Sequence, residues 1–497
     1  MSEGKVYLVG AGPGDPGLIT VRGMEILRTA DVVVYDRLAN PALLAQCRAG
    51  AKLIYVGKGP GGIKQAEIND VLVEEARAGH VVCRLKGGDP FLFGRGGEEA
   101  SYLVANGISF EVVPGVTSAI AVPAYAGIPV TDRRLASVVA MVSGHPAEDG
   151  PGSGPRWSEL GGADTIVTLM GVGSLPETVA ELLAAGRSPD TPSAVIQQGT
   201  TAEQRTIVSP LKRIAQEVAA AGIEPPAIMV VGRVVGLREE LAWVERKPLW
   251  GLRVLVTRPG HQAEALSRAL RDAGAEPVEF PCMKISHLAP TEEGLHALDR
   301  SYEWILFVSS NGVSSVAAYL RAAGRDWRAM PAGRIGAVGP GTAAALDAAS
   351  LRVDFMPSRY TVAALASELP GPLDGKAVLL PGRAVVNPRL GEGLAERGAE
   401  VTAWGVYEIV TPEPQTPLAE IVGPRLDIVT LTSGSAARGF VQLGGREAVG
   451  NAAVACIGPP TAEAAKGLGL RVDVVAEEHT VRGLVEAIVK HRAHEDA

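Results

Sequence analysis

The stretch VYLVGAGPGDPGLITVRG, residues 6–23, decides how the front of the chain folds. An apolar, strand-like run ends in a turn rich in glycine and proline, and a helix-like segment follows the turn. The G-x-G-x-x-G spacing from Gly12 matches a dinucleotide-binding fingerprint. Pro13 and Pro16 disfavour that interpretation, because a phosphate cradle needs backbone N–H donors and proline has none. The stretch predicts a strand–turn–helix unit of an α/β fold, with a simple tight turn as the alternative to a ligand-binding loop.

Similar units follow along the front half. Apolar runs predict strands at 5–9, 32–35, 53–56, 81–85, 110–113, 137–142, 165–169, 194–197 and 227–231. Helical periodicity predicts helices at 18–29, 65–78, 96–106, 117–125, 175–185 and 211–221. This alternation indicates an α/β fold, arranged as two lobes of about 1–114 and 115–245. A charged helical end that runs into Pro248 and Gly251 predicts the boundary with a back half of 250–497.

The back half contains an internal repeat. VLVTRPGHQAEALSRALRDAGAE from Val254 resembles VLLPGRAVVNPRLGEGLAERGAE from Val378, and ILFVSSNGV from Ile305 resembles IVTLTSGSA from Ile428. Two further matches follow in the same order, so the duplicated unit has about 120 residues. Each copy alternates apolar β-branched runs with alanine-rich helical stretches. Two copies predict paired α/β lobes with a ligand cleft between them.

Composition narrows the class of protein. The 497 residues carry a net charge of −8, which disfavours nucleic-acid binding. The N-terminus has no basic leader before an apolar core, and no stretch approaches 18 apolar residues, so we expect neither a signal peptide nor a membrane span. The four cysteines are isolated, which disfavours a disulfide framework and a zinc site. We expect a cytoplasmic, metal-free protein in which selected arginines line the cleft of any anionic ligand.

Three more motifs of the front half end strands in turns suited to ligands. VVCRLKGGDPFLFGRGGEE (81–99) contains a GGDP turn, whose bare backbone can approach a ligand closely. VVPGVTSAIAVPAYAGIPVT (112–131) places the hydroxyls of Thr117 and Ser118 at the start of a helix. DTIVTLMGVGSL (164–175) ends a strand at a Met-Gly pair. No G-x-x-x-x-G-K-[ST] run is present, which excludes a P-loop nucleoside triphosphatase.

Together with GAGPGDP, YDRL and EIN, these motifs resemble the uroporphyrinogen-III C-methyltransferase family, the tetrapyrrole branch of the class III methyltransferases, over about 1–243. The resemblance implies a two-lobed class III methyltransferase fold with S-adenosyl-L-methionine folded between the lobes. It also implies a homodimer formed through this half. The family positions that contact the cofactor correspond to Pro13, Gly87, Gly88, Asp89, Leu92, Thr117, Ser118, Met170 and Gly199.

The same resemblance implies catalytic roles for Asp36 of YDRL as base and Lys58 of the following GK as acid. The alternatives are a turn cap for Asp36 and a solvated loop lysine for Lys58. Arginines can clamp the carboxylates of a uroporphyrinogen, and Arg37 is the first candidate. Further candidates are Arg22, Arg28, Arg95, Arg133 and Arg134. Two departures from the family pattern fall at the expected tetrapyrrole rim: a shorter loop after GK without its histidine, and Asp132 in place of another histidine.

The repeat carries a second resemblance, to uroporphyrinogen-III synthase. It rests on VLVTRP, SSNGV, AVGPGTAAAL, TLTSGSAARGF, CIGPPT and EEHTVRGLVEAI, between 250 and 490. The resemblance implies a duplicated two-lobed α/β fold, with lobe A combining about 250–284 and 412–497 and lobe B spanning about 286–410. It implies no metal or cofactor in this half.

Tyr407 corresponds to the tyrosine that the synthase family favours as an acid, and Met283 is its partner in the other copy. The alternative for Tyr407 is an amphipathic tyrosine at the rim. Hydroxyls near helix starts are candidates for binding the substrate carboxylates, or else are simple N-caps. They are Thr432, Ser433, Ser435, Ser309, Ser310 and Thr480. Arg383 stands in LPGR where family members often have LPRG, which alters its reach.

The two resemblances imply consecutive reactions. The synthase, a lyase, would cyclise hydroxymethylbilane to uroporphyrinogen III with inversion of ring D. The methyltransferase would then methylate this product at C2 and C7 to give precorrin-2, which feeds siroheme or cobalamin synthesis. The alternatives are a front half acting on a later precorrin, a back half that is a non-catalytic, tetrapyrrole-binding regulatory module, and a nicotinamide dehydrogenase. The last is disfavoured by Pro13 and by the lack of a catalytic His or Lys constellation.

Overall fold

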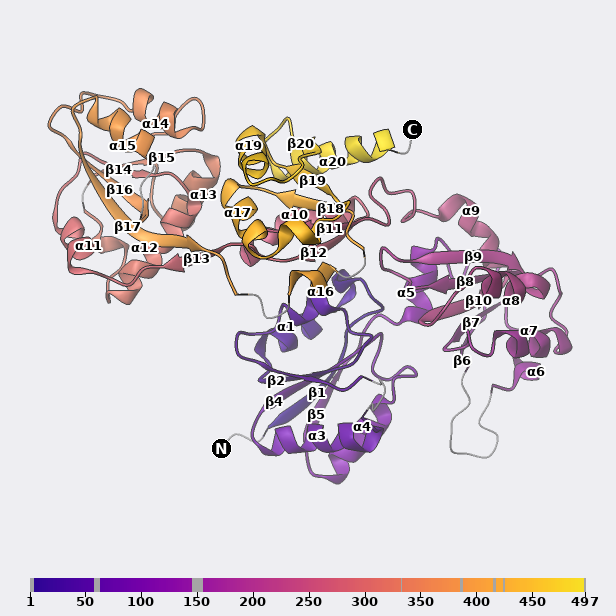
Figure 1. Cartoon of the computed structure of the whole chain (residues 1–497). Helices are drawn as coiled ribbons and strands as arrows, with labels where there is room; N and C mark the ends of the chain where they lie inside the picture. Colours follow the sequence, from indigo (N-terminus) through magenta and orange to yellow (C-terminus); the bar gives the residue numbers. More distant parts are fainter. Residues whose placement is uncertain are drawn as a thin grey trace. The chain divides into compact units, whose positions relative to one another are not determined.

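The computed structural model describes residues 4–57, 63–144, 155–331, 333–384, 388–413, 417–422 and 425–495 (Figure 1). Within these residues the chain is an α/β protein with four five-stranded sheets. It divides into two compact units, Met1–Val254 with Ser267–Val278 and Val485–Ala497, and Leu255–Leu266 with Glu279–Leu484. No helix of the described part is long and apolar enough to cross a membrane.

The first sheet is parallel throughout, with the strand order β3-β2-β4-β1-β5. Its strands are β1 (Lys5–Gly10), β2 (Val32–Tyr35), β3 (Lys52–Tyr55), β4 (Val81–Lys86) and β5 (Ser109–Val113). The accompanying helices are η1 (Pro16–Leu18), α1 (Val21–Thr29), α2 (Pro41–Leu44), α3 (Gln65–Arg77) and α4 (Gly96–Ala105). Because the strands share one direction, all their carboxyl ends lie at one edge, which is where open α/β sheets bind ligands.

The central strand β4 is buried on both faces. Leu85 packs in the cluster that contains α1, and Val82 packs in the cluster that contains α3 and α4. Side chains alternate along a strand, so Arg84 and Lys86 lie on the same face as Val82. Two cations therefore project into the interior beside α3 and α4, only 3% and 4% exposed.

The second sheet is mixed, with the order β6-β7-β10-β8-β9. β6 and β7 run parallel, and the remaining neighbours are antiparallel. The strands are β6 (Val139–Ser143), β7 (Thr165–Leu169), β8 (Pro192–Gln197), β9 (Arg205–Pro210) and β10 (Ala227–Val231). The helices are α5 (Ser118–Tyr125), α6 (Trp157–Leu160), α7 (Leu175–Ala184), α8 (Leu211–Ala220), η2 (Arg233–Leu237) and α9 (Arg238–Leu241).

Every strand and helix predicted for the front half is present, with ends displaced by at most three residues. The edge strand β9 was not predicted. Its sequence, RTIVSP, is short and largely polar, and it forms a sheet only because it pairs along β8.

The back half contributes two more sheets, ordered β12-β11-β18-β19-β20 and β13-β17-β16-β14-β15. Strands of the first are β11 (Arg253–Val256), β12 (Glu276–Glu279), β18 (Ile428–Leu431), β19 (Ala453–Cys456) and β20 (Val474–Val475). Strands of the second are β13 (Lys284–His287), β14 (Trp304–Phe307), β15 (Arg334–Ala337), β16 (Ala377–Arg383) and β17 (Glu400–Val410). The helices are α10 (Gly260–Asp272), α11 (Glu292–His296), η3 (Ala297–Asp299), α12 (Ser310–Ala322), η4 (Trp327–Ala329), α13 (Pro340–Ala348), α14 (Val362–Glu368), α15 (Pro388–Ala395), α16 (Leu418–Val422), α17 (Gly434–Gln442), α18 (Gly445–Ala448), α19 (Pro459–Gly467) and α20 (Val481–Glu495).

The two copies of the repeat exchange strands. β11 and β12 of the first copy share a sheet with β18, β19 and β20 of the second, in which β11 is the neighbour of β18. In the other sheet, β17 and β16 of the second copy lie between β13 and β14 of the first. One match needs a correction of one residue: β14 begins at Trp304 and β18 at Ile428, so Ser309 corresponds to Ser433 rather than to Thr432. The bounds predicted for the domains and lobes stay predictions.

Candidate active sites

Three strands of the first sheet lead into glycines that touch one another. Gly10 ends β1, Gly88 follows β4 and Gly115 follows β5. A Cβ on Gly115 would lie 2.2 Å from the carbonyl oxygen of Gly88, and one on Gly10 would lie 2.4 Å from Cα of Gly115. Gly88 also has a φ of 68°, which favours glycine. This edge of the sheet is therefore bare backbone, which a ligand can approach closely.

Asp89 ties the loop after β4 to the loop after β5. Its Oδ1 accepts a hydrogen bond from the Phe91 N–H at 2.8 Å, and its Oδ2 accepts one from the Gly115 N–H at 2.9 Å. A carboxylate can accept more than two hydrogen bonds, so Asp89 can also receive one from an amine or a hydroxyl of a ligand.

The amino end of α5 faces these glycines. Thr117 caps the helix, and its Oγ1 accepts a hydrogen bond from the Ala119 N–H at 3.3 Å. The place of a Cβ on Gly88 lies 3.8 Å from the Ser118 nitrogen and 3.9 Å from Cα of Thr117. Residues predicted from two separate motifs are thus brought together at the sheet edge.

The loop around Gly199 meets the loop after β1. The place of a Cβ on Gly14 lies 2.7 Å from Oγ1 of Thr200. Gly199 has no room for a side chain, because a Cβ there would lie 2.2 Å from Cγ1 of Val122. Met170 follows β7 with a φ of 55° and is 49% exposed, so a ligand can reach it.

The other predicted cofactor residues lie in the same loops. Pro13 stands between two glycines whose φ values are 79° and 155°. A Cβ on Gly87 would lie 2.6 Å from Cβ of Leu38. Leu92 is partly buried against the core of the second sheet.

A latch of hydrogen bonds holds the loop after β1. The Tyr125 hydroxyl donates to Oδ2 of Asp15 at 2.7 Å, and the Asp15 N–H donates to Oγ1 of Thr200 at 3.0 Å. Trp243 packs edge-on against the Tyr125 ring, with centroids 5.3 Å apart. Burial and the bond to Asp15 raise the pKa of Tyr125, so its hydroxyl remains a donor at neutral pH.

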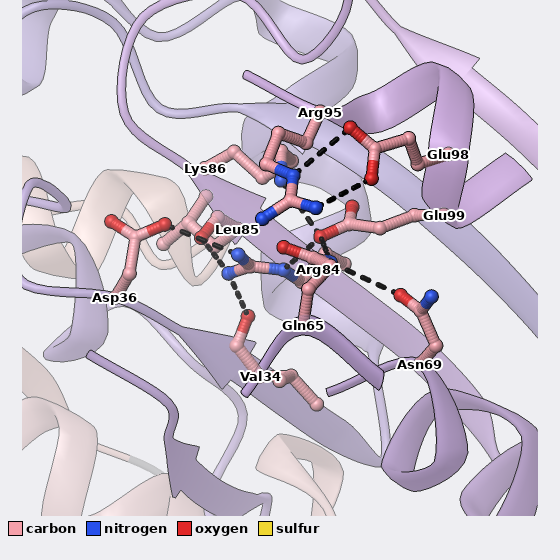
Figure 2. Close-up of polar contacts among 10 residues, drawn as sticks. All are labelled: Val34, Asp36, Gln65, Asn69, Arg84, Leu85, Lys86, Arg95, Glu98 and Glu99. Carbon is pink, nitrogen blue, oxygen red and sulfur yellow. Dashed lines mark hydrogen bonds and ion pairs between the residues drawn. The ribbon is translucent and has the colours of Figure 1, made fainter. Parts of the chain in front are cut away.

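Figure 2 shows a cluster of charged side chains beside the ends of β2 and β4. Arg84 donates from Nη2 to Oδ2 of Asp36 at 3.3 Å and from Nε to Oε1 of Glu99 at 3.2 Å. The same Glu99 oxygen accepts from Lys86 Nζ at 2.8 Å and from Gln65 Nε2 at 3.2 Å. Glu99 is fully buried, and its Oε2 has no hydrogen-bond partner among the described residues. Burial, together with the nearby Arg84 charge, lowers the pKa of Lys86.

Asp36 follows β2 with its side chain 25% exposed. Its Oδ1 accepts a hydrogen bond from the Leu38 N–H at 3.0 Å, so it does cap a turn, while its Oδ2 bonds to Arg84. Its predicted partner Lys58 lies outside the described residues.

The candidate arginines differ in their surroundings. Arg37 and Arg133 are exposed. Four others have surface partners: Arg22 with Glu111, Arg28 with Gln46, Arg95 with Glu98 and Arg134 with Asp132. The Arg134 side chain lowers the pKa of Asp132, so this departure from the family pattern supplies an anion that holds a neighbouring arginine.

In the back half, the two copies place equivalent residues at equivalent helix caps. Ser309 caps α12 and Ser433 caps α17, each accepting a hydrogen bond at 3.1 Å from the backbone N–H three residues later. The Ser309 hydroxyl lies 3.3 Å from the Tyr407 hydroxyl, and the Ser433 hydroxyl lies 3.6 Å from the Met283 sulfur. The copies therefore differ in chemistry at one matched position.

Tyr407 itself is 4% exposed and packs in the core of its sheet. Ser310 begins α12, and Thr432 directly precedes the cap of α17. Ser435 accepts a hydrogen bond from Arg438 at 3.1 Å, and Thr480 accepts one from the Gly483 N–H at 3.0 Å just before α20. Arg383 is exposed at the end of β16.

Comparison with known proteins matches two families along the chain. The family of Tetrapyrrole (Corrin/Porphyrin) Methylases matches residues 5–215, and the family of Uroporphyrinogen-III synthase HemD matches residues 264–486. Porphyrin biosynthesis protein HemD of Ruminiclostridium josui is 40% identical over 99% of this chain and 98% of its own length. The chain belongs to both families.

The methylase half has relatives of its own. The S-adenosyl-L-methionine-dependent uroporphyrinogen III methyltransferase of Methanosarcina barkeri is 53% identical over 48% of this chain and 94% of its own length. The Uroporphyrinogen-III C-methyltransferase of Bacillus subtilis is 42% identical over a match that covers 63% of this chain and 65% of that relative. The protein is thus a tetrapyrrole methylase fused to a HemD-type domain of porphyrin biosynthesis.

Sequence reasoning missed two groups of residues in the methylase half. The latch joins Asp15 to Tyr125, and the charged cluster joins Arg84 to Glu99, through contacts that no local pattern reveals. One signal was available, because VVCRLK places two cations on one face of an apolar strand, which demands buried counter-charges.

We expect Tyr125→Phe in the methylase half to weaken binding of S-adenosylhomocysteine about tenfold. The change removes a hydrogen bond to a carboxylate, which contributes about 1.5–3 kcal/mol, and the bond holds the loop that carries Pro13. Titration calorimetry measures the affinity. Tyr102→Phe is a matched control, because it removes a surface Tyr–Asp hydrogen bond to Asp70. Equal affinities for both variants would contradict the latch.

Proposed function

We propose that the chain catalyses two consecutive steps of tetrapyrrole synthesis. The synthase half cyclises hydroxymethylbilane to uroporphyrinogen III with inversion of ring D. The methylase half transfers two methyl groups from S-adenosyl-L-methionine to C2 and C7, giving precorrin-2 for siroheme or cobalamin synthesis. The observation that carries the methylase assignment is the bare edge formed by Gly10, Gly88 and Gly115, together with the names of the relatives.

The methylase half has groups suited to positioning and to proton transfer. S-adenosyl-L-methionine supplies an electrophilic methyl group, whose bonding pair stays on sulfur when the ring carbon attacks. The methylated macrocycle must then lose a proton, and the partly exposed Asp36 carboxylate can accept it. Exposed arginines such as Arg37 can bind the peripheral carboxylates. Lys58 stays a proposed acid.

The synthase half needs only hydroxyls and N–H donors. The bilane loses its terminal hydroxyl as water after an acid protonates it, and the open end of the chain then closes on ring D. Tyr407 is the proposed acid, and the Ser309 hydroxyl beside it can relay or orient its proton. Ser310, Thr432, Ser433, Ser435 and Thr480 are proposed to bind substrate carboxylates, with help from helix N-termini. We also propose a homodimer through the methylase half, which analytical ultracentrifugation tests.

One incubation tests the whole proposal. The purified full chain is mixed with hydroxymethylbilane and labelled S-adenosyl-L-methionine, and products are resolved by mass and by isomer. We expect isomer III carrying two labelled methyl groups. Unmethylated product would contradict the methylase role, and isomer I alone would contradict the synthase role.

The burial of Tyr407 favours a second candidate for the back half, a module that binds tetrapyrrole without cyclising it. An acid must reach its substrate, and the Tyr407 hydroxyl lies in the core beside Ser309. In that case hydroxymethylbilane would close at its spontaneous rate, to isomer I, while uroporphyrinogen III supplied directly would still be methylated.

We expect Tyr407→Phe to slow formation of isomer III by about 10²-fold or more, which is the lower range for losing a general acid. A stopped-time assay of isomers measures this. The control is Tyr302→Phe in the same core, which removes a hydroxyl bonded to the Ala297 carbonyl at 3.0 Å. It should lower stability by about 1 kcal/mol and leave the rate unchanged. Equal rates for wild type and Tyr407→Phe would exclude the tyrosine as the acid.

A further inference from the structure

The buried charges of the methylase half are not arranged for stability alone. Arg84 and Lys86 lie on the interior face of β4, and Glu99 lies opposite on α4. Taking ions out of water is unfavourable, and well-packed apolar residues of similar size often stabilise such a site more. Glu99 also leaves one buried oxygen without a partner, so the network is incompletely satisfied. Stability alone therefore does not explain why these charged residues are buried here.

Arg84 is the cation of the cluster that is hydrogen-bonded to Asp36, the residue after β2 (Figure 2). Its Nε donates to Glu99, and its Nη1 donates to the backbone carbonyls of Val34 in β2 and Leu85 in β4, at 3.5 and 3.2 Å. Because the guanidinium is planar and is held at Nε and Nη1, the direction of its Nη2 toward Asp36 is fixed. The Leu38 N–H holds the other carboxylate oxygen. Both oxygens of Asp36 are therefore oriented.

Lys86 differs from Arg84 in this respect. It donates to the same Oε1 of Glu99, at 2.8 Å, but to no atom of Asp36. The chain thus offers two buried cations on one strand face, of which one is hydrogen-bonded to the candidate base.

We propose that Arg84 is a positioning residue for methyl transfer. Anchored on Glu99, it holds the Asp36 carboxylate in the orientation that accepts the proton of the methylated ring. This inference rests on the methyltransferase function proposed above. Asp36 touches the reacting macrocycle in this scheme, and Arg84 acts through it.

Arg84→Lys tests the link, because a single ammonium cannot reach both Glu99 and Asp36 as the guanidinium does. The assay is single-turnover transfer of labelled methyl from S-adenosyl-L-methionine to uroporphyrinogen III by the full chain. Asp36→Asn should slow transfer by about 10²-fold or more. Arg84→Lys should slow it by about 10- to 100-fold, with S-adenosylhomocysteine affinity within about twofold of wild type. In the Asp36→Asn background, Arg84→Lys should have no further effect, because the two residues act as one unit.

The matched control is Lys86→Gln, which removes the other cation from the same Glu99 oxygen. It should lower the melting temperature but leave the transfer rate within about twofold. The proposal is overturned if Arg84→Lys keeps the wild-type rate, if its effect persists in the Asp36→Asn background, or if Lys86→Gln slows transfer as much.

If Arg84→Lys fails to bind S-adenosylhomocysteine, Glu99→Gln takes its place in the comparison with Asp36→Asn. Glutamine has nearly the shape of glutamate, and it weakens the ion pair that anchors Arg84. The two levels of failure are distinct. A wild-type chain that methylates no uroporphyrinogen III contradicts the proposed function. An active wild type whose rate survives Asp36→Asn contradicts the base role of Asp36 and with it the positioning role of Arg84, but not the methyltransferase function.

Discussion

A Gly115→Ala chain should lose at least about 100-fold in affinity for S-adenosylhomocysteine. The added methyl carbon would lie 2.2 Å from the Gly88 carbonyl oxygen and 2.7 Å from Cα of Gly10. Both neighbours are backbone, so the ends of β1, β4 and β5 must move apart. A displacement of about 1 Å in a positioned site can cost about 100-fold, and overpacking costs about 1–3 kcal/mol besides. Titration calorimetry on the full chain measures the affinity.

The matched change is Gly162→Ala, where an added Cβ meets no atom within 4 Å. This variant should bind S-adenosylhomocysteine as wild type does. A folded Gly115→Ala chain with unchanged affinity would contradict the assignment of the glycine edge as the cofactor site.

Glu99→Leu should destabilise the methylase half by about 3–5 kcal/mol. The change leaves Arg84 and Lys86 buried without their shared anion, and an uncompensated buried charge has about this effect. Scanning calorimetry of the full chain measures it. The transition of the methylase half is recognised by its upward shift when S-adenosylhomocysteine is added, because a multidomain chain does not unfold in two states.

Two further variants make this result specific. Glu98→Leu removes an exposed ion pair with Arg95 on the same helix and should change stability by at most about 1 kcal/mol. Replacing Arg84, Lys86 and Glu99 together by apolar residues should recover much of the stability lost in Glu99→Leu. On the positioning proposal, the same triple variant remains slow in methyl transfer. If the methylase half of Glu99→Leu unfolds at the same temperature as wild type, Arg84 and Lys86 have found other partners, and the prediction is contradicted.

Local sequence patterns predicted the strands and helices of the front half well and the contacts between them poorly. Apolar runs located β1 and β4 because buried parallel strands need continuous apolar residues. The edge strand β9 escaped, since its polar sequence becomes a strand only by pairing with β8. The repeat was detected, but the sequence match aligned Ser309 with Thr432, one residue before its structural equivalent Ser433. The error arose because the pair Ser309-Ser310 offers two candidates for the N-cap of α12.

Candidate site residues that lie in glycine turns were readable because only glycine suits them. Gly87 and Gly199 illustrate this, since a Cβ on Gly87 would lie 2.6 Å from Cβ of Leu38 and one on Gly199 would lie 2.2 Å from Cγ1 of Val122. The bond from Arg84 to Asp36 spans 48 positions, and the bond from Tyr125 to Asp15 spans 110. Pairings at such separations depend on how the sheet brings strand ends together, which a single sequence does not encode locally.

The exchange of strands between the two copies has a consequence for how this half could be divided. A fragment ending after α14 would hold two strands for one sheet and three for the other, and it could complete neither sheet alone. Two such fragments, however, could finish each other's sheets by domain swapping. A single copy would thus favour a symmetric dimer, whose two matched positions must be identical. Joining two copies in one chain lets these positions differ, as Tyr407 and Met283 do.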